Sequence, residues 1–196
     1  LDIAVYRMDI KNLLVAQRVG EDQFIGKNAG STKHQGLELS FNYWLNISPG
    51  IALIPFVNYT FNDHSFVTFI DDENDFSGNP LTGVPKHQIN SGLQLKHEKG
   101  FYWNTTYQHV GEIPLTDANA ISSDAFNVFN SRIGYYSNLS EKFSIGFDAG
   151  VNNLLNAKYA QSVLINAPSF GGNEPRYFYP GNDRNWYGAI RLGNRL

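Results

Sequence analysis

The chain of 196 residues has a formal net charge of −3, with 15 Lys and Arg residues against 18 Asp and Glu residues. This balance excludes a broad basic surface that could neutralise a phosphate backbone, so nucleic acid is not an expected partner. The absence of Cys excludes disulfides, thiolate metal sites and Cys nucleophiles. Aromatic residues make up 14% of the chain, beside 18 Gly and one Met, which favours strands and turns over helices.

Apolar and polar residues alternate with a period of two along most of the chain, and this alternation predicts β-strands. The pattern is clearest in GLELSFNYWLN, where every odd-numbered residue from Leu37 to Leu45 is apolar or aromatic. No run of about 18 apolar residues exists, so a membrane-spanning helix is not expected. The predicted strands are residues 1–15, 36–46, 51–62, 87–98, 101–110, 126–138, 143–153 and 184–193.

The connections between these predicted strands alternate in length. Up-and-down outer-membrane barrels have this asymmetry, with tight periplasmic turns and longer extracellular loops. Short turns are expected at 46–50, 99–100 and 139–142, and long loops at 17–33, 67–85, 115–125 and 159–183. Strands of about ten residues also match the length that a tilted strand needs to cross a bilayer.

The sequence therefore predicts an all-β fold, an antiparallel up-and-down transmembrane β-barrel with about eight strands and outer-membrane lipid against its apolar face. A soluble sandwich or lipocalin-like barrel is the alternative, because it too has alternating strands. Its strands would be shorter, at about five or six residues. Tyr and Trp near the strand ends and Asn, Gln and Ser on the opposite face favour the membrane barrel, with its aromatic girdle and wet lumen.

No motif in the sequence indicates enzyme catalysis or metal binding. The five His residues lack the close pairings that metal sites on one element use, and no Ser lies in a nucleophile-elbow motif. The acidic loop 70–80 superficially resembles a calcium loop, but Phe76 stands where Gly is required and Thr82 where the bidentate Glu is required. We therefore expect no catalytic residue, metal site or cofactor, and interpret this segment as an exposed loop tip.

The last long loop combines aromatic residues with Arg. Phe170, Arg176 and Tyr177 could hold a flat or anionic small ligand through stacking and charge-assisted hydrogen bonds. The alternative is that the segment PRYFYPG only guides the chain back into the barrel wall. For Pro180 and Gly181 this structural interpretation is favoured, whereas for Arg176 and Tyr177 both interpretations stay open.

The segment VNNLLNAKY resembles the penultimate-strand signature of TonB-dependent outer-membrane receptors, an Asn-Leu-Phe-Asn/Asp-x-x-Tyr pattern, with Leu155 in the place of the usual Phe. Four further stretches resemble family motifs in the family's order, so the resemblance covers essentially the whole chain. The matching residues are Asn153, Leu154, Asn156 and Tyr159; Asn28, Gly30, Gly36 and Glu38; Asn58, Tyr59, Thr60 and Asp63; Pro85, His87 and Asn90; and Pro180, Gly181, Arg184 and Gly188.

The resemblance implies a Gram-negative receptor whose barrel of about 22 strands surrounds an N-terminal plug. Such a receptor takes up scarce ligands, most often ferric siderophores and sometimes haem, cobalamin or carbohydrate, with energy passed on by TonB. Residues 1–196 would be the C-terminal part of this barrel, and the plug and TonB-contacting box would be absent from the chain. One departure is the ending RLGNRL, where the family usually has a terminal aromatic residue.

The leading hypothesis is thus a ligand-gated transporter that uses long loops to capture its ligand. A complete small eight-stranded outer-membrane barrel with a structural, adhesin or lipid-modifying role is the main alternative, and a soluble β-barrel carrier is a weaker one. The expected ligand contacts are Phe66, Phe69, Phe170, Arg176 and Tyr177.

Overall fold

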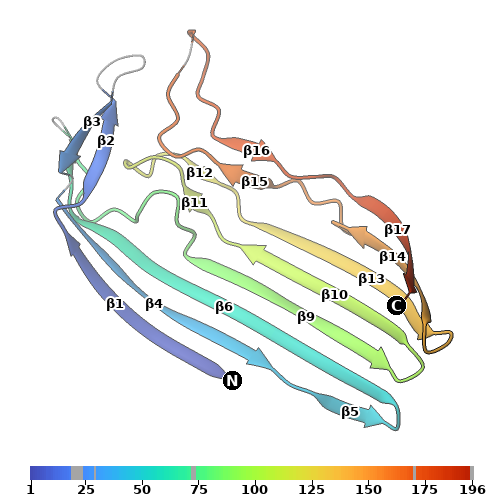
Figure 1. Ribbon diagram of the computed structural model, residues 1–196. Helices are drawn as coiled ribbons and strands as arrows, with labels where there is room; N and C mark the ends of the chain where they lie inside the picture. The colour runs from blue at the N-terminus through green and yellow to red at the C-terminus, as the bar shows by residue number, and fades with distance from the viewer. Residues whose placement is uncertain (19–23, 29, 72–73, 170, 195–196) are drawn as a thin grey trace.

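The computed structural model describes residues 1–18, 24–28, 30–71, 74–169 and 171–194, and nearly all of its regular structure lies in one curved antiparallel sheet (Figure 1). The strand order is β1-β4-β6-β9-β10-β13-β14-β17, with the short β5 paired to β6. These strands are β1 (Asp2–Lys11), β4 (Ser31–Asn42), β5 (Leu45–Ser48), β6 (Ile51–Thr68), β9 (His87–His97), β10 (Phe101–Val110), β13 (Phe126–Asn138), β14 (Phe143–Asn152) and β17 (Asn185–Asn194). The all-β antiparallel prediction is confirmed, and each of the eight predicted segments contributes a strand.

Two predicted strands are interrupted, which corrects their boundaries. The first ends at Lys11, because Asn12 takes a left-handed conformation (φ 58°) that breaks the extended backbone. The segment 36–46 is divided between β4 and β5, which leaves Tyr43 and Trp44 outside both strands. β4 also starts earlier than predicted, at Ser31.

The predicted short turns are present, although the first is confined to residues 49–50 because β5 extends to Ser48, and the long loops contain additional strands. Tight turns join β5 to β6, β9 to β10 and β13 to β14, with positive φ angles at Gly50 (76°) and Gly100 (94°). The long connections carry four small hairpins at the opposite end of the sheet from these turns (Figure 1). The hairpins are β2 (Leu14–Arg18) with β3 (Phe24–Asn28), β7 (Ile70–Asp71) with β8 (Asn74–Asp75), β11 (Ile113–Pro114) with β12 (Ser122–Ser123), and β15 (Ala160–Val163) with β16 (Phe178–Pro180).

The strand register separates the side chains onto an apolar and a polar face, because directly opposed residues of an antiparallel pair share a face. One row across the sheet is Leu53, Leu95, Trp103, Ile133 and Ala149. A row on the other face is Ser40, Asn58, Asn90 and Gln108. Every residue in the first row is apolar or aromatic and every one in the second is polar, as the alternation predicts.

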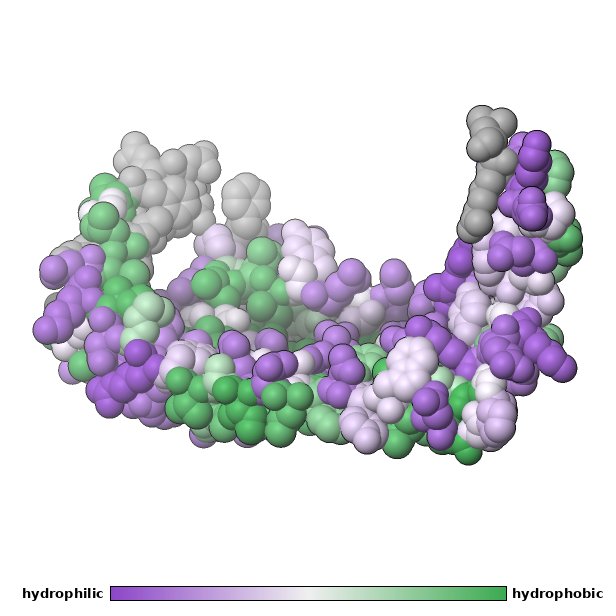
Figure 2. Space-filling view, turned by 60° about the horizontal axis from the view of Figure 1, so that its bottom comes forward, coloured by the Kyte–Doolittle hydropathy of each residue, from purple (hydrophilic) through white to green (hydrophobic). Residues whose placement is uncertain are grey.

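The apolar face is left uncovered. Figure 2 shows a trough, with hydrophobic residues along much of its lower, convex edge. Val5 is 78% exposed, Ile133 58% and Ile190 69%. Such a continuous exposed apolar surface marks contact with a membrane or a partner rather than with water. Among the described residues, no helix is long and apolar enough to cross a membrane.

The few fully buried side chains lie mainly toward the long-loop end of the sheet. Leu115, which follows β11, has the lowest exposure of the hydrophobic residues. Phe66, Phe69, Val110 and Val128 are also buried there. Apolar packing therefore supports the loops, while the strands are held mainly by their backbone ladder.

Candidate functional site

The loops at the long-loop end are joined by hydrogen bonds that centre on Asp117. Its carboxylate accepts from the Thr82 hydroxyl at 2.5 Å and from Asn166 Nδ2 at 2.9 Å. Its carbonyl oxygen accepts from Asn79 Nδ2 at 2.8 Å. Asn79 and Thr82 precede β9, Asp117 lies between β11 and β12, and Asn166 follows β15. Three connections far apart in the sequence thus form one surface.

Phe66 and Phe69 lie beneath the first of these connections. Their ring centroids are 4.6 Å apart, Phe69 is 5.6 Å from Phe76, and Leu81 packs against the same cluster. Both Phe side chains are buried. In this structure they hold the loop on the sheet, and their faces are covered by protein rather than presented to a ligand.

The β15–β16 hairpin carries the other candidate contacts. Leu164 donates its backbone N–H to the carbonyl of Tyr177 at 2.7 Å, which extends the hairpin ladder beyond the Val163–Phe178 pair toward the connecting loop. Arg176 is exposed and Tyr177 is half-buried. Phe170 lies outside the described residues. The connection between β15 and β16 therefore carries an exposed cation next in sequence to a half-buried aromatic residue, whereas Phe66 and Phe69 belong to a separate cluster.

The Asn-rich segment after β14 makes a clamp between strands. Asn153 is only 2% exposed and has φ 51°. Its Oδ1 accepts from Ala157 N–H at 2.8 Å, and its Nδ2 donates to the carbonyls of Ala157 and Asn182 at 2.8 and 3.0 Å. Asn156, with φ 53°, accepts from the Arg184 N–H at 2.9 Å. These side chains satisfy backbone groups that no strand pairs, which gives them an architectural role.

Tyr159, Gly181 and Pro180 complete this region. The Tyr159 ring lies 5.0 Å from the ring of Phe126 and directly over Gly181, where any Cβ would collide with it. The Tyr159 carbonyl also accepts from the Gly181 N–H at 2.8 Å. Pro180 ends β16. The small glycine therefore allows an aromatic ring to close the base of the last long connection.

On the polar face, Gly36 allows the side chain of Tyr6 to cross a whole strand. A Cβ at Gly36 would lie 2.6 Å from the Tyr6 hydroxyl. Tyr6 reaches over β4 to β6, where its hydroxyl lies 3.0 Å from both Asn62 Oδ1 and His64 Nε2. Pro85 contributes through its carbonyl, which accepts from Asn62 Nδ2 at 3.0 Å. Two residues of the predicted family motifs, Gly36 and Pro85, thus shape one polar cluster.

Glu38, His34 and His64 belong to the same face. Glu38 lies in register between Ala4 and Thr60. The ring centroids of His34 and His64 are 4.8 Å apart, although spacing along the sequence indicated no histidine pairing. The alternation places both on the polar face, but only the register of β4 with β6 brings them together. Among the described residues, no group of three or more His, Cys, Asp or Glu is positioned to hold a metal ion.

A charged cluster that the sequence did not indicate lies further along the wall. Asp148 Oδ1 is 2.6 Å from Arg132 Nη2, and Asp148 Oδ2 is 2.5 Å from Arg191 Nη2. Arg132 also donates to the Tyr102 hydroxyl at 3.0 Å. The Asp148 side chain is 3% exposed, so a buried carboxylate is compensated by two guanidinium groups. The cluster keeps a net positive charge on the concave wall.

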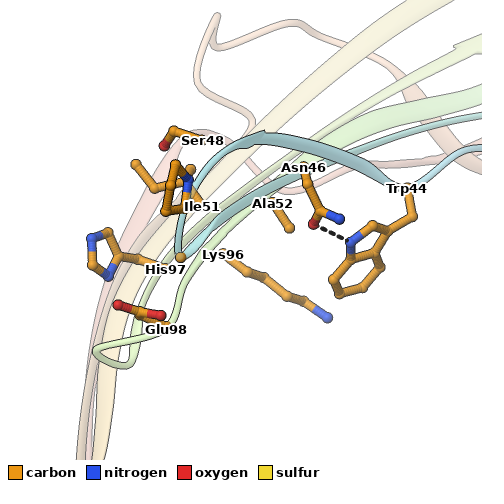
Figure 3. Close-up of a pocket in the computed structure, with 10 residues that line it drawn as sticks. Trp44, Asn46, Ser48, Ile51, Ala52, Lys96, His97 and Glu98 are labelled. Atoms are coloured by element: carbon orange, nitrogen blue, oxygen red, sulfur yellow. Dashed lines mark hydrogen bonds between the residues drawn. The ribbon is translucent and has the colours of Figure 1, made fainter.

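Two open hollows lie at opposite ends of the sheet, and they differ in how near they are to the candidate residues. The first, of about 660 Å³, lies at the short-turn end, where Trp44 donates its indole N–H to Asn46 Oδ1 at 2.9 Å and Lys96 lies near the indole ring (Figure 3). The second, of about 630 Å³, lies at the long-loop end and includes Tyr159, Pro180 and Gly181 in its lining. Only the second hollow adjoins the connections that carry the predicted contacts.

A curved antiparallel sheet with an exposed apolar face, a polar concave face, short turns at one end and hydrogen-bonded loops at the other defines a segment of an outer-membrane β-barrel wall. The β-barrel model described as TonB dependent receptor-like matches residues 1–154. The chain belongs to the TonB-dependent receptor family, whose members reside in the bacterial outer membrane.

Individual relatives agree with this assignment. The chain is 26% identical over 185 residues to the vitamin B12 transporter BtuB of Vibrio vulnificus (strain CMCP6), covering 91% of this chain and 26% of the relative. Its fold is similar to the ferric yersiniabactin uptake receptor FyuA from Yersinia pestis, with a TM-score of 0.69, 16% identity, and coverage of 99% of this chain and 27% of the receptor.

A third comparison gives the same fold. The siderophore receptor PiuA from Acinetobacter baumannii matches with a TM-score of 0.70 at 15% identity, covering 98% of this chain and 26% of that receptor. The chain thus spans about a quarter of the length of these relatives. The relatives are transporters and receptors rather than enzymes, which agrees with the expectation of no catalytic activity.

Proposed function

We propose that residues 1–196 form the C-terminal part of the barrel of a TonB-energised outer-membrane transporter whose ligand is a ferric siderophore or a similar small chelate. The plug and the contacts with TonB would come from other parts of the polypeptide. The observation that carries this proposal is the family match over residues 1–154, supported by a fold shared with siderophore receptors. This family membership favours a receptor over a small barrel with a structural or adhesive role.

The proposed ligand contacts are Arg176 and Tyr177 on the last long connection. An exposed guanidinium attracts the negative charge of a ferric chelate, and the adjacent ring offers a flat apolar surface. Their hairpin is tied by Asn166 to Asp117, and so to the connection that precedes β9. A contact surface held in place before binding loses less conformational entropy on binding. Phe66 and Phe69 support this surface from below.

Uptake of radiolabelled iron tests the proposal in cells that produce the intact receptor as the sole route of entry. A panel of catecholate, hydroxamate and phenolate ferric siderophores should contain a ligand whose uptake requires both the receptor and TonB. The Arg176→Ala, Tyr177→Ala double variant should weaken its binding by about tenfold or more, equivalent to about 1.4 kcal/mol. Lys142→Ala, at the exposed short turn of the opposite end, is the control and should bind normally. Uptake that is independent of TonB would contradict the proposed mechanism.

Cobalamin is a second candidate ligand, because the relative with 26% identity is named a vitamin B12 transporter. Cyanocobalamin belongs in the same uptake assay for this reason. TonB-dependent uptake of cyanocobalamin, without uptake of any ferric chelate, would replace the siderophore proposal and retain the transporter function.

A further inference from the structure

Three residues with metal-binding side chains lie in one row on the polar face. Met8 is directly opposite His34 in the β1–β4 pair, and His34 is directly opposite His64 in the β4–β6 pair. Opposed residues in antiparallel strands have Cβ atoms about 4.5–5.5 Å apart. The two imidazole rings accordingly lie 4.8 Å apart between their centroids. Met8, the only methionine of the chain, is 53% exposed, so the row is open to the lumen.

The hydrogen bonds around Tyr6 fix the tautomer of His64. Asn62 Nδ2 donates to the Pro85 carbonyl, so Asn62 Oδ1 is the atom that faces Tyr6. The Tyr6 hydroxyl donates its single proton to that Oδ1, and it must therefore act as an acceptor toward His64. Nε2 of His64 then carries the proton, and Nδ1 carries the lone pair. This arrangement leaves Nδ1 as the nitrogen able to bind a metal ion.

His34 is oriented in a similar way. Its Nε2 lies 3.0 Å from the hydroxyl of Thr32, a residue that is almost fully buried. Among the described residues, neither Nδ1 atom of the histidine pair has a hydrogen-bond partner. Metal-binding histidines commonly have their second ring nitrogen held by a hydrogen bond in this manner. Tyr6 and Thr32 are therefore positioned as supports for two imidazole ligands.

We propose that Met8, His34 and His64 form a binding site for a copper ion, as Cu(I), on the lumen wall of the barrel. A thioether with two imidazoles is a soft ligand set that favours Cu(I) over the oxygen-seeking Mg²⁺ and Ca²⁺. Because none of the three residues belongs to the proposed chelate contacts, the site is independent of the siderophore proposal. The site lies near the long-loop end, because Met8 is three residues from the end of β1 and His64 is four residues from the end of β6. An ion that enters the lumen from this end would meet the wall there.

Competition with the chelator bicinchoninate measures the site directly in the intact receptor, purified in detergent and titrated with Cu(I) under reducing conditions. Wild type should bind Cu(I) at a site that His34→Ala and His64→Gln each weaken by about tenfold or more. The His64→Gln side chain keeps an N–H donor for Tyr6 and removes the lone-pair nitrogen, which separates metal binding from folding. Tyr6→Phe should weaken the site by about tenfold through loss of the support for His64.

Met8→Leu identifies the metal. It should weaken Cu(I) binding while leaving any Zn²⁺ binding unchanged, and X-ray absorption should show that the sulfur neighbour of copper is lost. His109→Ala, which removes a histidine bonded to Asn127 on the opposite face, is the matched control and should change nothing. Equal Cu(I) affinity in wild type and in the His34→Ala, His64→Gln double variant would overturn the site, and unchanged binding in Met8→Leu would overturn the copper assignment. Each result is read without siderophore or TonB, so it stands apart from the uptake assay.

Discussion

Asp117 and Asn166 exchange two hydrogen bonds across 49 positions of sequence: the Asp117 N–H donates to Asn166 Oδ1 at 3.1 Å, and Asn166 Nδ2 donates back to Asp117 Oδ2 at 2.9 Å. This reciprocal pair holds two long connections together at the end of the barrel where a ligand would arrive. Since Thr82 also donates to Asp117, a third connection depends on the same carboxylate.

Asp117→Ala should loosen all three connections at once. Each hydrogen bond contributes about 1 kcal/mol, with more for those to a charged group. The carboxylate partners that are lost are Thr82 and Asn166, so hydrogen exchange of amides near these two residues should accelerate, while amides in the strand ladder keep their protection. Asp124→Ala, which removes an exposed carboxylate of the same connection, is the control. Faster exchange confined to the neighbours of Asp117 itself would contradict the coupling.

Loss of the Asp148 carboxylate should destabilise the barrel wall. Breaking a fully buried ion pair typically costs about 3–5 kcal/mol, and the cost here should be smaller, because the Arg132 and Arg191 side chains that remain are 34% and 54% exposed and water can solvate them. Asp148→Ala leaves both Arg132 and Arg191 without their shared partner, so the urea midpoint of unfolding in detergent should fall. Asp9→Ala is the comparison, because Asp9 and its partner Arg7, 3.1 Å apart, have side chains that are 52% and 64% exposed, and such pairs contribute about 0–1 kcal/mol. Equal effects of the two changes would show that the cluster is not buried in the folded receptor.

Two substitutions separate the two ways in which Asn153 stabilises the fold, through its amide hydrogen bonds and through its tolerance of a left-handed backbone conformation. Asn153→Ala loses the amide contacts with Ala157 and Asn182 and keeps a side chain in a left-handed conformation, which is unfavourable by about 1–2 kcal/mol. Asn153→Gly loses the same contacts but tolerates that conformation. We therefore expect both variants to unfold at lower urea concentrations than wild type, with Asn153→Ala lower than Asn153→Gly. Asn152→Ala, which removes an exposed amide bonded to Asn185, should have a small effect.

The β7–β8 hairpin should respond to pH through Asp75. Hydrogen bonds from the Ser77 side chain and then from its backbone N–H lower the pKa of Asp75 below its usual value. A carboxyl group whose pKa is lowered by folding stabilises the folded hairpin above its unfolded pKa, and this contribution disappears as the pH falls through the folded pKa. Ser77→Ala should raise the pKa of Asp75 toward its ordinary value, measured by carbon NMR of the carboxyl group. A titration midpoint that is identical in both proteins would exclude this hydrogen bond as the cause.

Local pattern predicted the strands and their faces because a period of two depends only on neighbouring residues. Leu53 and Leu95, for example, lie on the predicted face and also in register with each other. The pairing of His34 with His64 could not be predicted in the same way, because it depends on the register between two strands. The burial of Phe66 and Phe69 depends on Leu81 and Phe76 in a folded connection, which alternation does not describe. Polar loops have no comparable periodicity, so the partnership of Asp117 with Asn166 was also beyond the sequence pattern.

The clamp formed by Asn153 and Asn156 allows the sequence of the last long connection to vary while the barrel wall is preserved. Asn153 bonds to Asn182 and Asn156 bonds to Arg184. The two ends of the last long connection are therefore hydrogen-bonded to each other, and these bonds do not involve the middle of the connection. The segment between residues 160 and 180 can then be exchanged as a cassette while β14 and β17 keep their pairing. A foreign peptide epitope inserted near the tip should be displayed on the cell surface, and ligand preference can diversify at this position without rebuilding the wall.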